Sequence, residues 1–403
     1  QRYDLPVPLW LWVTGAGATI VLSFVIVGVF SRKDGAKTAY SRFNLLNVSL
    51  LRCLAHRVPL AIVRAVVVIF LIATVLAGFI GNPDPFRNLA PVMVWVVWWV
   101  GIAFVCALIG DLWALVNPFR TIFMWAEWVL GRLTKGRQLS TAQPYPLALA
   151  MWPAVAGLLI FFWAELIWSG GSVPRNLATA VMIYAVVTWV GMFVYGRDVW
   201  LQNADAFSIV FGILARFAPL ELRVVNGTAL IRACTSSACR NKTLECVNGY
   251  HCLTNTEPDR REWNLRPPAL GLLNDQQVTF SMMVLVIILL ATVTFDGLLE
   301  TRLWTHILDR TLIGEIRWVG SAALVLFSAG FLFIYLFFSV LMCQFAQRYG
   351  ERKGAGHLKS TLEVASAFVL TLVPIAIAYH LAHYLSYLVI TGQYFIPRVS
   401  DPF

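Results

Sequence analysis

Long apolar stretches recur along this chain, and polar segments separate them. Eight stretches approach or exceed the roughly 20 residues that a helix needs to cross a bilayer, and none alternates apolar and polar residues as barrel strands do. A lipid-spanning segment must satisfy its own backbone hydrogen bonds, so these stretches predict transmembrane helices. The predicted spans are about 8–31, 59–81, 91–116, 147–169, 177–196, 278–299, 318–346 and 361–390.

Composition agrees with this pattern. Of the 403 residues, 59% are hydrophobic and only 13% are charged, which is more apolar surface than one soluble core can hide. The 16 Trp and 12 Tyr residues suit a protein with many anchors at the headgroup level. We therefore predict an all-α polytopic membrane helix bundle with about eight transmembrane helices, whose first partner is the lipid bilayer.

The placement of Lys and Arg predicts the orientation. The chain begins with Gln1, which fits removal of a signal peptide and an N-terminus outside the cell. With that start the inner loops are 32–58, 117–146, 197–277 and 347–360, and these hold most of the basic residues. We expect a bacterial inner (cytoplasmic) membrane protein with both termini periplasmic. The net charge of +10 is explained by these loops, and no nucleic-acid partner is expected.

Two apolar segments near the inner side are too short or too broken to be spans. In 205–219 the apolar run from Ala206 to Ala215 is too short to cross, and we expect an amphipathic helix at the cytoplasmic interface. If this segment crossed, every later orientation would invert. After the third span, Asn117 and Pro118 should break the helix, and Asp111 should cap or pair. The segments after Gly110 and Gly196 are faintly alike, without a clear repeat.

The polar region 220–277 divides the chain into three parts. Residues 1–219 hold predicted transmembrane helices 1–5 and the interfacial helix. Residues 220–277 form a small Cys-containing cytoplasmic insertion, and residues 278–403 hold helices 6–8 and a C-terminal tail.

Four ionisable side chains are predicted at one depth near the periplasmic face. Glu165 and Asp296 each lie about 18 residues into their spans, and His380 and His383 lie about 20 residues into theirs, at a rise of about 1.5 Å per residue. His380 and His383 share one helical face because they are three residues apart. Ionisable residues within a membrane mark functional sites by default, and inward carboxylates and imidazoles can bind a metal. Local hydrogen bonding near the headgroups is the competing interpretation.

The identity of such a metal is left open among zinc, copper and iron, and a proton or ion path fits the same residues. His306, in the following outer loop, is a further candidate ligand or a solvated loop residue. Haem is disfavoured, because bis-His ligation needs imidazoles on opposite sides of the iron and His380 and His383 lie on one face.

Four cysteines cluster in the polar region, at Cys234, Cys239, Cys246 and Cys252, with His251 beside the last. In a reducing cytoplasm this cluster predicts a metal site, of zinc or an iron–sulfur centre. In the periplasm the same residues would form two disulfides. Four free thiols are the third interpretation. Cys53, Cys106 and Cys343 are isolated and should pack as small apolar residues.

Three segments, QRYDLPVPLWLW at the start, REWNLRPPALGLL at 261–273 and AYHLAHYLSYL at 378–388, resemble a family of bacterial inner-membrane proteins labelled fenitrothion hydrolase. The resemblance runs the length of the chain and implies cleavage of an organophosphorus ester. It supplies no catalytic residues. A phosphotriesterase usually needs metal-bound hydroxide, for which the candidates are Glu165, Asp296, His380 and His383.

The sequence thus leads to three hypotheses of function. The first is a metal or proton-coupled site near the periplasmic face, in a subunit of a larger membrane assembly with partner membrane chains, for example a respiratory one. The second is a membrane-embedded, metal-dependent hydrolase of organophosphorus esters. The third is a transporter, for which Pro374 within the last span is the one hint of an interrupted helix. Whether the protein is an enzyme is left open.

Overall fold

The computed structural model describes residues 42–54, 56–134, 138–224, 246–247, 261–273, 278–311, 316–353 and 360–402, together with Thr14. The chain divides into two compact units, 1–42 and 43–403, and all the helices and strands named below belong to the second. The first predicted span, 8–31, lies outside the described residues except for Thr14.

Seven helical segments of the described residues are long and apolar enough to cross a membrane. They agree with the second to eighth predicted spans, so the all-α polytopic bundle is confirmed. The spans are formed by α3 (Arg57–Ile80), α4 with η2 and α5 (Leu89–Pro91, Val92–Gly101 and Ile102–Leu108), η3 with α8 (Leu147–Leu149 and Trp152–Leu166), α9 (Pro174–Tyr195), α14 (Phe280–Leu299), α16 (Ile316–Lys353), and α17, η8 and α18 (Thr361–Phe368, Val369–Leu372 and Val373–Gly392).

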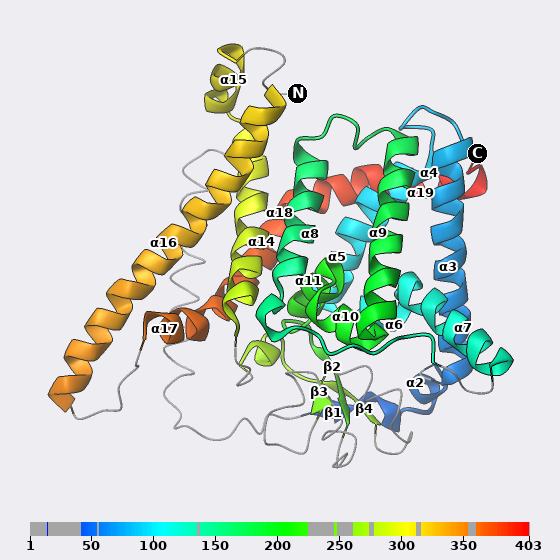
Figure 1. The fold of residues 1–403 in the computed structure, drawn as a ribbon, viewed down its shortest axis with the longest axis horizontal. Coiled ribbons are helices and arrows are strands. Elements are labelled where there is room, and N and C mark those ends of the chain that lie inside the picture. The colour runs from blue at the N-terminus through cyan, green and yellow to red at the C-terminus, as the bar shows by residue number, and fades with distance from the viewer. Residues whose placement is uncertain are drawn as a thin grey trace. The chain divides into compact units, whose positions relative to one another are not determined.

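Successive spans run in opposite directions, so their connections alternate between the two ends of the bundle (Figure 1). The shorter helices lie before α3, at these connections and after α18. They are η1 (Leu45–Asn47), α2 (Ser49–Leu54), α6 (Leu112–Val116), α7 (Pro118–Leu133), α10 (Arg197–Asn203), α11 (Ala206–Leu214), η6 (Leu270–Leu272), α15 (Arg302–Asp309) and α19 (Phe395–Ser400).

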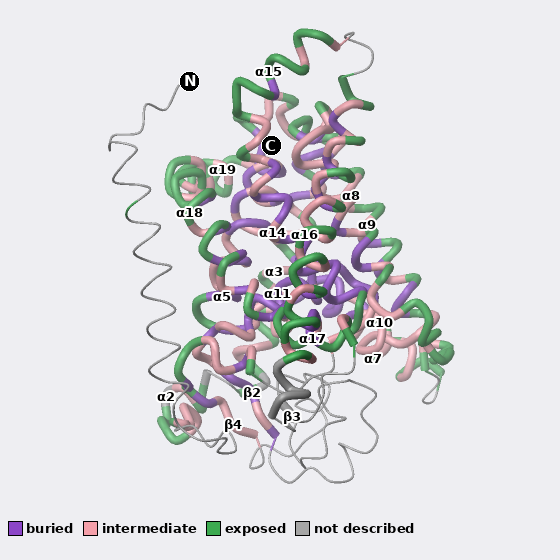
Figure 2. The backbone as a smooth tube through the Cα atoms, turned by 90° about the vertical axis from the view of Figure 1, so that its left-hand side faces the viewer, coloured by how far each residue is buried: buried purple, intermediate pink, exposed green. Residues whose placement is uncertain are grey.

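The core is centred on α14 and α11. Nearly every residue of α14 from Ser281 to Phe295 is buried, and α14 packs against α8, α16 and α18. Figure 2 shows the same concentration of buried residues along α14 and α11. An α-helix that is apolar on all sides is stable only where other helices surround it or lipid does. Here the surrounding helices do, so α14 provides a fixed frame for the side chains at its ends.

The third predicted span, 91–116, is longer than the helix in the structure. The helix ends at Leu108, and a new helix starts at Leu112. The carbonyl of Ile109 accepts a hydrogen bond from the backbone N–H of Leu220 instead of continuing the helix. Asp111 then caps α6 by accepting from the N–H of Ala114 at 3.1 Å, as predicted. Asn117 caps α7 in the same way through the N–H of Arg120, so the predicted break at Asn117 and Pro118 is confirmed.

Segment 205–219 differs from its prediction. Its helix α11 has nine residues, too few to cross, in agreement with the sequence. An interfacial amphipathic helix would keep a polar face on water, yet seven residues of α11 are buried and the helix packs on α5, α6, α8 and α10. The expected amphipathic character is therefore wrong, because neighbouring helices cover α11 on most sides. Its position at the cytoplasmic interface stays a prediction.

The two segments that looked faintly alike adopt the same local structure. Each follows a span with a Gly, a short helix, an Asn or Asp cap and a second helix. Asp205 caps α11 by accepting from the N–H of Ser208 at 2.9 Å, as Asn117 caps α7. Two residues after each cap, Phe119 and Phe207 both contact Tyr184 of α9, at ring distances of 5.0 and 5.4 Å.

A small antiparallel sheet adjoins the end of the bundle where α5 finishes. Its order is β1-β4-β2-β3, with β1 (Phe43–Asn44), β2 (Leu220–Val224), β3 (Cys246–Val247) and β4 (Arg261–Leu265). Leu222 lies opposite Trp263, and Asn44 lies opposite Asn264. The described part of the region 220–277 therefore pairs with a strand that precedes α3. The sequence did not predict this strand, because two residues carry no periodic signal.

Candidate functional site

Three helices deliver the predicted outer residues to one place. Glu165 is in the last turn of α8, Asp296 is in the last turn of α14, and His380 and His383 are in α18. The ends of α8 and α14 that carry the two acids lie at the same end of the bundle (Figure 1). The contacts described next join these helices, so the predicted convergence of acids and imidazoles is present in the structure.

Asp296 and His383 form the first contact. Nε2 of His383 lies 2.6 Å from Oδ2 of Asp296, and the two side chains are 36% and 23% exposed. A carboxylate at this distance accepts a hydrogen bond from the ring N–H and fixes the orientation of the imidazole. The other ring nitrogen is then left to take or give a proton. This arrangement is typical of a general base or of a proton-carrying histidine.

Glu165 and Tyr384 form the second contact. The hydroxyl of Tyr384 donates to Oε1 of Glu165 at 3.1 Å, and Oε2 of Glu165 is buried without a hydrogen-bond partner among the described residues. Buried polar atoms are nearly always paired, so an acceptor without a donor at this position requires an explanation. A bound water or a cation would each satisfy Oε2.

Tyr384 connects the two contacts. Its ring lies 4.7 Å from the ring of His383 and 4.7 Å from that of His380. The sequence interpretation did not include this residue. The signal was available, because Tyr384 follows His383 directly and lies four residues after His380, on the same helical face.

His380 is placed differently from His383. It is only 5% exposed, and its Nε2 has no hydrogen-bond partner among the described residues. Aromatic rings surround it, with Trp99 at 5.5 Å, Phe104 at 5.9 Å and Tyr384 at 4.7 Å between ring centroids. The ring of His380 is therefore enclosed by aromatic side chains, whereas that of His383 is partly exposed. The sequence analysis did not predict a role for Trp99 either, because it is one of three Trp residues within five positions, Trp95, Trp98 and Trp99.

The four predicted residues do not form a shared coordination sphere. Among the described residues there is no group of three or more His, Cys, Asp or Glu side chains placed to hold a metal ion. Asp296 and His383 are engaged with each other, and Glu165 is engaged with Tyr384. The arrangement is a set of two hydrogen-bonded pairs, and its chemistry is that of groups that exchange protons.

The remaining candidate residues separate from this site or lie outside the described structure. His306 is in α15, which follows α14, and joins none of these contacts. Cys234, Cys239 and Cys252 lie outside the described residues, and only the backbone of Cys246 is described, in β3. Cys106 and Cys343 are free and buried, as predicted, whereas Cys53 is free and exposed.

Taken with the fold, these features define a multi-pass helical membrane protein with an acid–imidazole–phenol cluster at one end of its bundle. No protein-family model, no curated protein and no solved structure matches the chain. The class of the protein therefore rests on its own spans and contacts.

Proposed function

We propose that this membrane protein works through a proton-coupled site formed by Asp296, His383, Tyr384 and Glu165. The observation that carries the proposal is the pair of hydrogen bonds, at 2.6 and 3.1 Å, that the neighbouring residues His383 and Tyr384 make to Asp296 and Glu165, while their own rings meet edge to face. Carboxyl, imidazole and phenol groups all bind and release protons. An ionisable cluster of this kind within membrane helices is typical of a proton relay.

The position of the cluster supports exchange with one side of the membrane. His383 and Asp296 are partly exposed, whereas His380 is buried and Oε2 of Glu165 is inaccessible. The ring of Tyr384 contacts that of His383 and its hydroxyl donates to Glu165, so the exposed pair and the buried carboxyl belong to one cluster. We expect the exposed side to be the periplasm of a bacterial inner membrane, from the distribution of basic residues along the sequence.

The proposal includes a partner chain in the membrane, for which α16 offers an exposed face. Its large side chains Trp318, Leu326 and Phe333 are strongly exposed and recur at about seven to eight residues, which places them along one face. Only 17% of its most apolar stretch is buried. That face suits lipid and equally suits a helix of a partner chain, so a partner is part of the proposal.

Infrared titration of the protein in lipid tests the proton-coupled site. We expect a protonated-carboxyl band that titrates in wild type and changes in Glu165→Gln and in Asp296→Asn. Glu127→Gln is the matched control, because Glu127 lies on α7 and pairs with Arg197 away from the cluster. A titration that is identical in wild type and both cluster variants would overturn the proposal.

Elemental analysis separates a proton site from a metal site. We expect equal metal content in wild type and in a His380→Ala, His383→Ala double variant. A stoichiometric zinc, copper or iron ion that is present in wild type and lost in the double variant would replace the proton-coupled site with a metal centre.

The exposed Asp296–His383 pair favours a second candidate, hydrolysis of a hydrophobic ester. A histidine oriented by a carboxylate can activate water for attack, and the family resemblance implies an organophosphorus ester as substrate. Turnover of an aryl phosphotriester by purified protein, abolished by His383→Ala in a folded variant, would support it. Turnover that is absent, or unchanged in His383→Ala, would exclude it.

The break in the last span bears on the third candidate, a transporter. The segment η8 interrupts the helix between α17 and α18, directly before Pro374. Interrupted helices often carry transporter sites. Uptake of a solute into liposomes, lost on replacement of Asp296, would support this candidate.

A further inference from the structure

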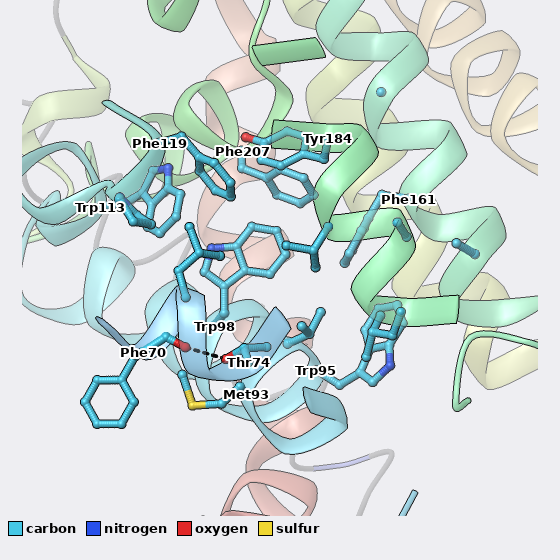
Figure 3. A pocket seen from close by; sticks show the side chains of 18 of the residues that line it. Phe70, Thr74, Met93, Trp95, Trp98, Trp113, Phe119, Phe161, Tyr184 and Phe207 are labelled. Carbon is cyan, nitrogen blue, oxygen red and sulfur yellow. Dashed lines mark hydrogen bonds between the residues drawn. The ribbon is translucent and has the colours of Figure 1, made fainter. Parts of the chain in front are cut away.

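Helix α7 has a buried half and an exposed half. Its first turn is fixed in the bundle, where the ring of Phe119 contacts those of Trp113 and Tyr184. These three rings line one wall of an apolar pocket (Figure 3). An exposed apolar patch on a helix marks an interaction site. The second half of α7 carries such a patch, formed by Trp125 at 45% exposure, Trp128 at 62%, Val129 at 46% and Leu133 at 78%.

Two charged side chains of α7 point into the protein. Glu127 pairs with Arg197 at 2.5 Å, and Arg120, which is only 4% exposed, pairs with Asp198 at 3.3 Å. A helix on a water-facing surface places its charged side outward and its apolar side inward. In α7 the apolar side is outward and these two charges are inward. This inverted pattern indicates that the outer side of α7 faces lipid.

The neighbours of α7 place its exposed half at the edge of the hydrocarbon. The indole of Trp189, in the last two turns of α9, donates to a backbone carbonyl in the first turn of α7 at 3.1 Å. Glu127 pairs with Arg197, which begins the helix directly after α9. The α9 span has 22 residues, close to the thickness of the hydrocarbon core. Trp125 and Trp128, on either side of Glu127, therefore lie at the headgroup boundary, where Trp is enriched.

One cation lies on this outer side. The guanidinium of Arg132 lies 4.9 Å from the centre of the Trp128 ring. No carboxylate of the described residues forms an ion pair with Arg132. A guanidinium over an aromatic face keeps N–H groups at its edge that fit two oxygens of a phosphate. At the headgroup boundary the phosphates belong to phospholipids, and anionic lipids attract such a cation most strongly.

We propose that the outer side of α7 docks in the lipid at the headgroup boundary, with Arg132 bound to the phosphate of an anionic phospholipid. The inverted polarity of the helix, its level beside the end of α9 and the cation over Trp128 each support this occupant. Water and a partner chain are the competing neighbours. The docking surface lies at the opposite end of the bundle from the proton-coupled site, and the proposal does not depend on that site (Figure 1).

Fluorine NMR tests the docking in the wild-type sequence, with fluorotryptophan in place of tryptophan and the protein in nanodiscs. The variants Trp125→Phe and Trp128→Phe each remove one resonance and so assign it. We expect a phospholipid that carries a nitroxide high on its chain to broaden both resonances more than one labelled at the chain end. The resonance of Trp99, which is 1% exposed, is the control and should be broadened least.

A gadolinium chelate in the water phase separates the competing neighbours. If the chelate broadens Trp125 and Trp128 while the lipid label does not, the helix faces water. Protection of both resonances from both agents would indicate a partner chain. Either result would overturn the proposal.

Replacement of Arg132 tests the phosphate contact. In wild type the broadening of Trp128 should reach its midpoint at about fivefold less labelled phosphatidylglycerol than labelled phosphatidylcholine, the contribution of one cation near the headgroups. Arg132→Gln should bring this preference close to one, because the amide carries no charge. Arg175→Gln is the matched control, since Arg175 lies in the first turn of α9, at the far end of that helix, and it should keep the preference. Thermal unfolding checks that each variant is folded. A fivefold preference that persists in folded Arg132→Gln would overturn the phosphate contact.

Discussion

His383 and Asp296 are joined by a hydrogen bond of 2.6 Å between Nε2 and Oδ2, which ties α18 to the last turn of α14. The two residues are 87 positions apart in the sequence. The bond therefore fixes the relative position of two spans as well as the orientation of the imidazole. Its strength and its neighbours lead to the first two predictions.

A double-mutant cycle on Asp296→Asn and His383→Gln should give a coupling energy of at most about 1 kcal/mol, because both side chains are partly exposed and solvent screens their charges. Unfolding in mixed detergent measures the four variants. Strictly additive effects would show that the bond contributes nothing to stability.

Glu165→Gln should destabilise the protein less than Glu165→Ala does, since the amide oxygen can still accept from Tyr384. Glu165→Ala should cost about 1–3 kcal/mol, because it leaves the Tyr384 hydroxyl buried without a partner. Adding Tyr384→Phe to Glu165→Ala should recover part of this loss. Equal unfolding midpoints for the Gln and Ala variants would contradict this account.

The pKa of the Asp205 carboxyl lies above its usual range because burial penalises the charged form. The folded state then binds a proton at pH values where the unfolded state has released it. Stability from this group is greatest below the unfolded value of 3.8 and declines as pH rises through the raised folded pKa.

Asp205→Asn should remove that decline while keeping one acceptor oxygen for the N–H of Ser208; its NH2 group replaces the oxygen that accepts from Tyr184, and the Tyr184 hydroxyl oxygen can accept from it in turn. Thermal midpoints of wild type and variant, measured from about pH 4 to about pH 7, should approach each other toward the acid end. A wild-type slope that persists in the variant would assign the pH dependence to another group.

Glu221 and Arg266 form a fully buried ion pair beneath the sheet, with both side chains 0% exposed. Glu221→Ala should destabilise the protein by about 3–5 kcal/mol, because the guanidinium is left buried without its carboxylate. Replacing both residues, as Glu221→Leu with Arg266→Met, should recover most of that loss. A double variant no more stable than Glu221→Ala would show that the pair does not act as a unit.

Gly78 allows the close approach of α3 and α9. A Cβ at this position would lie 2.5 Å from Cβ of Ala178 and 2.8 Å from the carbonyl oxygen of Pro174. Gly78→Ala should therefore cost about 1–3 kcal/mol through overpacking. Gly330 is the control, since nothing lies within 4 Å of its added Cβ, and Gly330→Ala in α16 should be neutral or stabilising. Equal effects at both glycines would contradict this packing.

The sequence predicted the spans well because their signal is local. A run of apolar residues such as that in α14 identifies a membrane helix by length alone. It also predicted the meeting of Glu165, Asp296, His380 and His383, since depth along a helix follows from residue count. The pairing within the cluster depends on the tilt and rotation of α18, which packing sets, so the aromatic cage of His380 was not predictable, whereas Tyr384 could have been included from its place on the same face as His380.

The surroundings of α11, in contrast, could not be predicted from the sequence. Composition cannot distinguish a short apolar helix at the membrane surface from one enclosed by neighbouring helices. Phe207 and Phe211 are buried because α5 and α8 pack against α11.

The hydrogen bond from Trp263 to Asn44 joins residues 219 positions apart, across the small sheet. When the ribosome has released Asn44, the strand that will hold it has not yet been made. Five of the predicted spans precede β4 in the chain. Phe43 and Asn44 therefore have no β4 strand to pair with while those spans are inserted. The sheet therefore forms late in synthesis. A chain truncated before Arg261 would insert its first helices but would lack β4, which joins β1 to β2.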